Sequence, residues 1–200
     1  MSHVHNIAAS VLQVIRQRRS IPPESFHPHR KVEDSIIEYM LDSANWAPTH
    51  GLTEPWRFVV FTGKGLSKLG EYQASLYKQI TPVTEFKQTK YDKLVQRPML
   101  ASHVIALGMI RQPSQKIPLI EEIASVACAV QNMMLTATAY GVATYWTTGG
   151  ITYAEEAKPY FGLHNPEDRL MGFLYVGFAK DEWPSGTRRP IDEKIRWVRE

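Results

Sequence analysis

The amino-acid sequence predicts an α+β fold in which helices flank a central mixed or antiparallel sheet of four to five strands. Four apolar segments rich in β-branched and aromatic residues indicate strands, at 57–62, 102–110, 142–146 and 170–178. Long segments whose apolar residues have helical spacing separate these strands. No repeat, low-complexity tract or Gly/Ser linker interrupts the pattern, so we expect a single domain over residues 1–200.

The first helices are predicted from apolar residues that recur every three to four positions. A short helix over 11–18 stops before Pro22-Pro23, because proline disfavours the helical conformation of the residue before it and has no backbone N–H. A second helix covers 31–45, and a helical stretch at 66–90 is broken by Pro82.

The longest predicted helix, 121–140, is apolar around almost its whole circumference. Such a helix is buried on most sides, either as a central core helix or as one covered partly by another subunit. We therefore expect Cys128 to be a small core residue. Glu121 and Glu122 open this helix, where the positive end of the helix dipole favours acidic side chains.

Two further features are expected in the C-terminal part. Thr152 is placed to cap a short helix over 152–158, with Glu155 completing a capping box. After Trp183 the chain is charged and is expected to form an extended tail.

Composition narrows the class of protein. With 44% hydrophobic and 22% charged residues, the chain is typical of a soluble globular domain. A net charge of +3 is too mild to indicate nucleic-acid binding by itself. The single cysteine excludes an intrachain disulfide, and the polar start shows no signal-peptide core, so we expect a cytoplasmic protein. The apolar stretch 117–140 is too polar for a membrane span.

Two paired-arginine segments lie at opposite ends of the chain, Arg18-Arg19-Ser20 and Arg188-Arg189. The planar guanidinium group matches phosphate oxygens, and a neighbouring serine adds a hydroxyl. If the fold brings the two segments together, they form a pocket for a phosphorylated ligand. The alternative is that both pairs are solvated surface residues, the usual place for arginine.

Two loops could hold the rest of a ligand. The stiff loop 46–58 carries His50 and Glu54 between a helix and a strand, a common place for a binding site. The segment Trp146-Thr147-Thr148-Gly149-Gly150 ends a strand, where glycines allow backbone N–H groups to face a flat heterocycle. The alternatives are a structural corner for the first loop, with Trp56 in the core and His50 on the surface, and a plain turn for the second.

Metal binding is not expected. The pairs His3/His5 and His27/His29 lack the cysteine or carboxylate at ligand spacing that a zinc site requires. The sequence contains neither a GxGxxG dinucleotide fingerprint nor a Walker A motif. No Ser/His/Asp set is recognisable, so no catalytic residue is assigned.

Taken together, the motifs resemble the FMN-dependent nitroreductase family, in particular its small single-domain members. The resemblance covers nearly the whole chain in the right order. Its motifs are Arg18-Arg19-Ser20-Ile21, Ala47-Pro48-Thr49-His50, Glu54-Pro55-Trp56-Arg57-Phe58, residues 129–135, Tyr140-Gly141-Val142, residues 172–177 and Arg188-Arg189-Pro190.

The resemblance implies a homodimer with FMN at the subunit interface. Arg18 and Ser20 would hold the phosphate, with Arg189 and Arg188 reaching it from the tail, and Arg19 would lie along the flavin or its ribityl chain. His50 would contact the cofactor from the partner subunit. Trp146, Thr147, Thr148 and Gly149 would run beside the isoalloxazine. Glu54 stands where many members carry Gln or Asn, and an ionised carboxylate only accepts hydrogen bonds.

The implied activity is hydride transfer from NAD(P)H, through flavin N5, to an electron-poor acceptor such as a nitroaromatic or quinone, in a ping-pong reaction. In such an enzyme the cofactor carries the chemistry and the protein supplies position and charge. Reductive dehalogenation or flavin modification on the same fold is the alternative. A non-enzymatic anion- or nucleic-acid-binding module ranks last, since no aromatic pattern interleaves with the basic pairs.

Overall fold

A computed structural model describes residues 2–200 and contains one four-stranded sheet. The strands are β1 (Trp56–Thr62), β2 (His103–Met109), β3 (Ala143–Thr147) and β4 (Arg169–Gly177). They lie in the order β1-β2-β4-β3, and every neighbouring pair is antiparallel. The α+β prediction is therefore confirmed, with four antiparallel strands where the sequence left the number and direction open.

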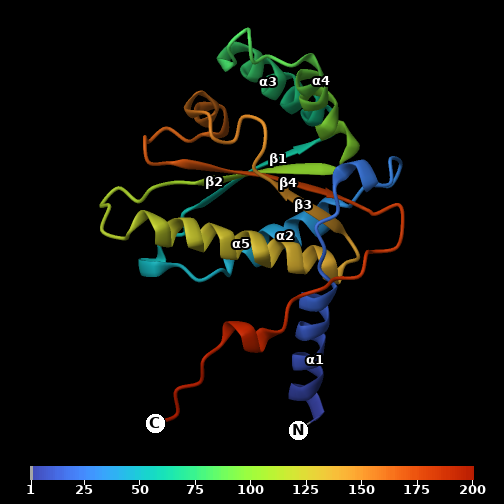
Figure 1. The fold of residues 1–200 in the computed structure, drawn as a ribbon, viewed down its shortest axis with the longest axis vertical. Helices are drawn as coiled ribbons and strands as arrows, with labels where there is room; N and C mark the ends of the chain where they lie inside the picture. The colour runs from blue at the N-terminus through green and yellow to red at the C-terminus, as the bar shows by residue number, and fades with distance from the viewer. Residues whose placement is uncertain (1) are drawn as a thin grey trace.

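Helices cover both faces of the sheet (Figure 1). On one face lie α2 (Asp34–Asn45) and α5 (Leu119–Ala139). The other face carries α3 (Lys64–Ile80), α4 (Gln88–Gln96) and the 3-10 segment η4 (Glu155–Phe161). The remaining short 3-10 turns are η1 (Pro23–Ser25), η2 (His50–Leu52), η3 (Arg97–Leu100) and η5 (Ile191–Lys194). Among the described residues, no helix is both long and apolar enough to cross a bilayer.

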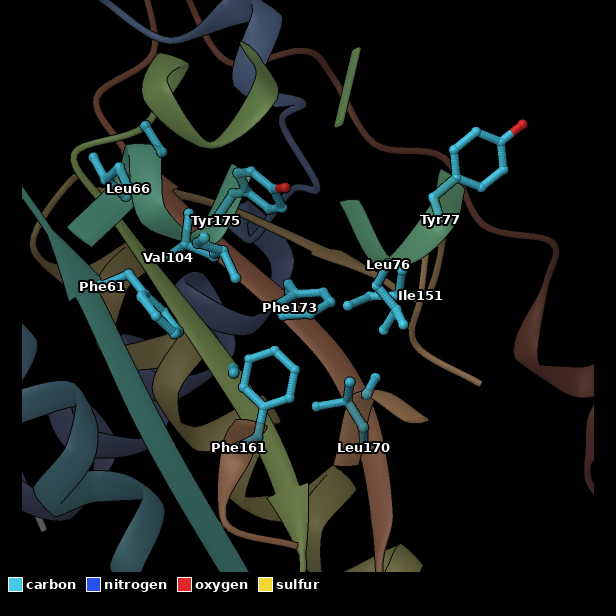
Figure 2. Close-up of a cluster of buried hydrophobic side chains, with 14 of the residues drawn as sticks. Phe61, Leu66, Leu76, Tyr77, Val104, Ile151, Phe161, Leu170, Phe173 and Tyr175 are labelled. Atoms are coloured by element: carbon cyan, nitrogen blue, oxygen red, sulfur yellow. The ribbon is translucent and has the colours of Figure 1, made fainter. Parts of the chain in front are cut away.

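Strand β2 is buried along its whole length because both sheet faces are covered. Its side chains alternate between two cores, as the period of a strand requires. Val104 and Ala106 join the cluster beneath α3, whereas Ile105 and Leu107 join the cluster beneath α5. Figure 2 shows the first cluster, with Phe173 of β4 near its centre.

The two chain ends leave the sheet on the same side (Figure 1). Helix α1 (Ser2–Gln17) projects from the body and is nine residues longer at its start than the predicted helix 11–18. The backbone of His3 and His5 lies in this helix, and their side chains are outside the described part. After residue 183 the tail is exposed and extended except for the turn η5, as the sequence predicts.

Helix α5 is buried on one side only in this single chain. Ala129, Val130 and Met133 are fully buried, while Ala124 and Cys128 are exposed. The prediction that Cys128 is a core residue is therefore wrong for the isolated chain. Of the two expected arrangements for this helix, the first, a central core helix, is not what the single chain shows.

The predicted capping box at Thr152 does not form. Ala154 precedes the segment η4, and no side chain caps it. Thr152 Oγ1 instead donates to the Gly149 carbonyl at 2.9 Å, and Glu155 pairs with Lys158 Nζ at 2.5 Å. The threonine thus stabilises the turn that follows β3 rather than a helix.

Gly172 allows β3 to lie close to β4. Its φ of 113° lies where side chains are disfavoured, and a Cβ at this position would overlap the Thr147 carbonyl. The β4–β2 register also shifts beside it, between Leu107 and Gly108. The glycine therefore sets the position of Thr147, at the end of β3.

Candidate functional site

Arginines from both ends of the chain meet in one cleft. The cleft has a volume of about 750 Å³, and we call it the arginine cleft. It is lined by Ile15, Arg16, Arg18, Arg19, Gln131, Ser185, Gly186 and Arg188. The described lining contains four arginines and no carboxylate, so the cleft presents concentrated positive charge suited to a phosphate.

The electrostatics of Arg18 show that this charge is not balanced within the chain. Partial burial lowers the pKa of the Arg18 guanidinium, and the positive charges of Arg188 and Arg19 lower it further. Arg18 Nη1 lies 3.4 Å from Ser20 Oγ, so the serine hydroxyl stands beside the guanidinium as the sequence suggested. A bound anion would relieve the repulsion between these arginines.

Arg19 is held by backbone carbonyls. Its Nε donates to Pro184 O at 2.8 Å, and Nη1 donates to Arg16 O and Arg18 O, both at 2.7 Å. A Cβ on Gly186 would overlap the guanidinium, so the tail backbone passes directly against it. Arg19 therefore fastens the tail to the end of α1 and brings Arg188 to the cleft.

The arginine cleft is connected to the sheet through Ser20. Ser20 forms a parallel bridge with Thr144 of β3, and the Ile21 N–H donates to the Thr144 carbonyl at 3.0 Å. β3 is an edge strand, and within the described sheet no strand pairs with its outer side. From Thr144 to Thr147 the strand covers about 10 Å at its usual rise per residue.

A second pocket lies at the far end of β3, between the sheet and α3–α4. This α3–α4 pocket has a volume of about 180 Å³. Thr147, Gly149 and Gly150 line it together with Gln73, Lys90, Lys93, Leu94, Arg97, Phe173 and Tyr175. It therefore joins part of the predicted Trp146–Gly149 segment to basic residues that carried no sequence motif.

Arg97 is the most constrained cation of the α3–α4 pocket. Its guanidinium lies 5.1 Å from the ring centre of Tyr145 and 5.5 Å from that of Tyr175. Arg97 Nε lies 3.0 Å from Glu24 Oε1, in the segment that follows Ser20. Burial alone would raise the pKa of the Glu24 carboxyl, but a backbone hydrogen bond, Arg97 and Lys93 outweigh it and lower the pKa. Glu24 thus stays ionised and orients Arg97.

The remaining strand-end residues have local partners. Trp146 is half-buried, and its Nε1 donates to Met171 O at 2.9 Å. The Gly149 N–H donates to Thr147 Oγ1 at 3.3 Å, while Thr148 is exposed. These contacts shape the turn and leave its outer surface open beside the α3–α4 pocket.

His50 and Glu54 lie apart from both pockets. His50 Nδ1 is 2.6 Å from Glu121 Oε2, at the start of α5. Gln131, in the arginine cleft, is ten residues further along that helix, which corresponds to about 15 Å. Glu54 is exposed, and its backbone φ is 43°. Within one chain, this loop does not reach the arginine cleft.

The first acidic residues of α5 do more than complement the helix dipole. Glu121 pairs with His50, and Glu122 is fully buried in an ion pair with Arg111. The hydrogen bond with Glu122 raises the pKa of the Arg111 guanidinium. Glu122 therefore anchors the loop before α5 as well as the helix start.

Comparison with known proteins decides the family. The model of the Nitroreductase family matches residues 15–178, more than half of the chain. The chain belongs to the nitroreductase family.

Relatives of this nitroreductase-family chain agree with that assignment. It is 29% identical over 196 residues to the Bacillus subtilis (strain 168) protein named "Putative NAD(P)H nitroreductase YfhC", covering 96% of this chain and 95% of that protein. A nitroreductase-like family protein from Bacillus cereus has a TM-score of 0.77 and 27% identity, covering 95% and 96% of the two chains. The FMN-dependent nitroreductase NfnB from Mycobacterium smegmatis, solved with NADPH, has a TM-score of 0.73 at 20% identity, covering 96% and 100%. This last likeness concerns the fold alone.

The predicted site residues of this family member fall into three places. The arginine cleft contains Arg18, Arg19 and Arg188, with Ser20 beside it, whereas Arg189 is exposed and outside its lining. Thr147 and Gly149 line the α3–α4 pocket, with Trp146 and Thr148 next to it in sequence. His50 and Glu54 form the third place, the loop that contains η2.

Sequence reasoning missed the basic side of the α3–α4 pocket. Lys90, Lys93 and Arg97 recur at spacings that place them on one helical face, which was the available signal. Gln73 carried no signal at all. As for metals, within residues 2–200 no group of three or more His, Cys, Asp and Glu side chains is placed to hold an ion.

Proposed function

We propose that this chain is an FMN-dependent oxidoreductase that passes hydride from NAD(P)H to an electron-poor acceptor such as a nitroaromatic or a quinone, in a ping-pong reaction. The observation that carries the proposal is the meeting of Arg18 and Arg188 in one cleft, joined by the edge strand β3 to a donor-rich pocket. The family membership supports the same activity.

The residues fit both the phosphate and the ring of FMN. The arginine cleft suits the phosphate, which carries close to two negative charges near neutral pH. Arg18, Ser20 and Arg188 would bind it, and Arg19 would hold the tail in place. Trp146, Thr147, Thr148 and Gly149 would lie along the ring, which the α3–α4 pocket would receive at one edge. Among described buried side chains, the Gln73 Nε2 donor lacks a protein partner there, which fits an acceptor-bearing ring edge.

FMN, when bound, supplies the hydride-accepting and hydride-donating chemistry. The protein's part is position and charge. Arg97 lines the α3–α4 pocket and would place a positive charge beside the ring, where negative charge develops during reduction. The backbone of the turn Gly149-Gly150 allows close approach. No side chain of the chain is assigned as a nucleophile or as an acid.

A second copy of the chain would complete the site. His50 lies about 15 Å along α5 from the arginine cleft, so it would reach FMN from the partner subunit. Exposed large apolar side chains support a dimer, because a second subunit could remove them from water. They include Ile7, Val11, Leu12 and Ile15 of α1, Ile120 of α5, and Trp197 and Val198 of the tail. We place the dimer, formed from one domain per chain, in the cytoplasm; Cys128 cannot form an intrachain disulfide.

Purification followed by two assays tests the proposed activity. We expect a yellow protein that releases FMN on denaturation, and NAD(P)H consumption that rises when a nitroaromatic or quinone is added. A colourless protein that does not bind added FMN contradicts the proposal. Bound FMN without turnover of either acceptor would instead favour a dehalogenating or flavin-modifying reaction.

Subunit mixing tests the shared site. Arg18→Ala and His50→Ala homodimers should each bind FMN weakly, because each lacks one side of both sites. After subunit exchange, random pairing should restore tight binding at about a quarter of all sites, since each mixed dimer has one intact site. If exchange between labelled subunits is verified and no tight site returns, the two residues do not act across an interface.

A further inference from the structure

The side chain of Gln73 has a buried donor that no protein group accepts from. Gln73 lies in α3, is 3% exposed and lines the α3–α4 pocket. Its Nε2 has no hydrogen-bond partner among the described residues. Leaving a buried amide donor unpaired is unfavourable, so its presence calls for a partner that the pocket receives.

The position of the amide shows where that partner would lie. A Cβ at Gly150 would be 4.0 Å from Gln73 Oε1, so the carboxamide stands against the turn that follows β3. That turn contains Gly149, where the proposed function places the flavin ring. The carboxamide therefore lies in the wall of the α3–α4 pocket, next to the turn where the proposed function places the ring.

The other groups around this pocket favour an acceptor-rich ligand. Arg97 and Lys93 only donate, and Tyr175 adds a hydroxyl. Burial raises the pKa of Tyr175 to about 12, so its hydroxyl stays protonated and can donate at neutral pH. Gln73 is different, because its carboxamide also offers an acceptor, Oε1.

We propose that Gln73 recognises the imide edge of the FMN ring, an inference that rests on the proposed function. This edge presents a carbonyl, an N–H and a second carbonyl in a row. A carboxamide is complementary to it, since Nε2 donates to a carbonyl and Oε1 accepts from the N–H. Gln73 is thus a positioning residue, on α3, that holds the ring in register with the turn at Gly149-Gly150.

The test compares Gln73→Leu with Gln96→Leu, an exposed glutamine on α4. In Gln73→Leu the apo-protein should unfold at a higher temperature, because an unpaired buried donor is removed. FMN should bind about threefold to tenfold more weakly, the effect of one or two lost neutral hydrogen bonds. The control should change neither quantity.

An FMN analogue methylated at the imide nitrogen adds a second readout. Wild-type protein should bind it more weakly than FMN, because the methyl group replaces the donor that faces Oε1. In Gln73→Leu the ratio of the two dissociation constants should move towards one, as expected when the two changes remove the same interaction. The midpoint potential of bound FMN should also shift in Gln73→Leu and remain unchanged in Gln96→Leu.

Each outcome decides between the alternatives. If Gln73→Leu lowers the apo unfolding temperature and leaves both dissociation constants unchanged, Gln73 has a structural role through internal water and the inference is overturned. If wild-type protein binds no FMN at all, the proposed function fails first. Weaker FMN binding with an unchanged methyl-analogue ratio assigns the effect to pocket shape and also overturns the inference.

Discussion

Replacing Arg18 with alanine should separate phosphate recognition from every other contribution to flavin binding. Arg18 lies in the arginine cleft with Arg188, and its side chain is beside Ser20 Oγ. A charge-assisted hydrogen bond contributes about 1.5–3 kcal/mol. Its loss should raise the dissociation constant of FMN about 10- to 150-fold at 25 °C.

The apo-protein should not lose stability in the same variant. The pKa of Arg18 is lowered by its partial burial and by the neighbouring positive charges of Arg188 and Arg19. The arginine therefore experiences net repulsion when no anion is bound, and its removal relieves this repulsion. We expect the unfolding temperature of Arg18→Ala apo-protein to equal or exceed that of the wild type.

Fluorescence titration of apo-protein with FMN and with riboflavin measures the effect. Riboflavin lacks the phosphate, so Arg18→Ala should weaken FMN binding while leaving riboflavin binding within about twofold, an energy smaller than RT. Lys68→Ala is the matched control, because it removes one exposed positive charge from α3 outside both pockets. Arg188→Ala should behave like Arg18→Ala. Equal losses for FMN and riboflavin, or no loss for either ligand, would refute the phosphate assignment.

Three further predictions concern stability. Burial raises the pKa of Tyr175 to about 12, so the folded state favours the protonated phenol more than the unfolded state does. This preference adds about 2–3 kcal/mol to the free energy of unfolding below pH ~10, and the addition is lost as pH rises towards 12. The free energy of unfolding of apo Tyr175→Phe, measured at several alkaline pH values, should lack this loss. Gly172→Ala should destabilise the fold by about 2 kcal/mol more than Gly141→Ala. Both glycines have positive φ, but only at Gly172 would the added Cβ overlap a neighbouring strand. Equal unfolding midpoints in urea would contradict this prediction. Glu122→Leu should cost about 3 kcal/mol, because the buried Arg111 loses its buried carboxylate partner and keeps only the longer pair with Glu167 at 3.5 Å. Adding Arg111→Met should recover most of this loss in thermal unfolding, and no recovery would show that the pair is not the cause.

The sheet could be predicted because its strands are apolar over short, well-bounded segments. β2 is buried on both faces, and its continuous apolar run identified it despite the lack of alternation. The positions of the helix ends were predicted less accurately. The start of α1 is largely polar and the apolar spacing was recognised only from Val11, so the predicted helix began nine residues too late. The face of α5 that contains Cys128 is apolar but exposed. The sequence could not distinguish such a face from one that is buried in the core.

The candidate site was predictable only where a motif carried chemistry. The arginine pairs share a residue type suited to phosphate, so their meeting could be proposed from opposite ends of the chain. Arg188, rather than Arg189, lines the cleft because the backbone of the tail follows Arg19, a contact that no local pattern encodes. Gln73 and Arg97 reach the second pocket through the packing of α3 and α4, which sequence spacing could not orient against β3.

The most direct test of the central claim is a crystal structure of the protein with FMN bound. We predict that the phosphate lies against Arg18, Ser20 and Arg188, that the ring lies beside Thr147 and Gly149, and that the second subunit contributes His50. A flavin bound away from the arginine cleft, or a site built wholly within one subunit, would contradict it.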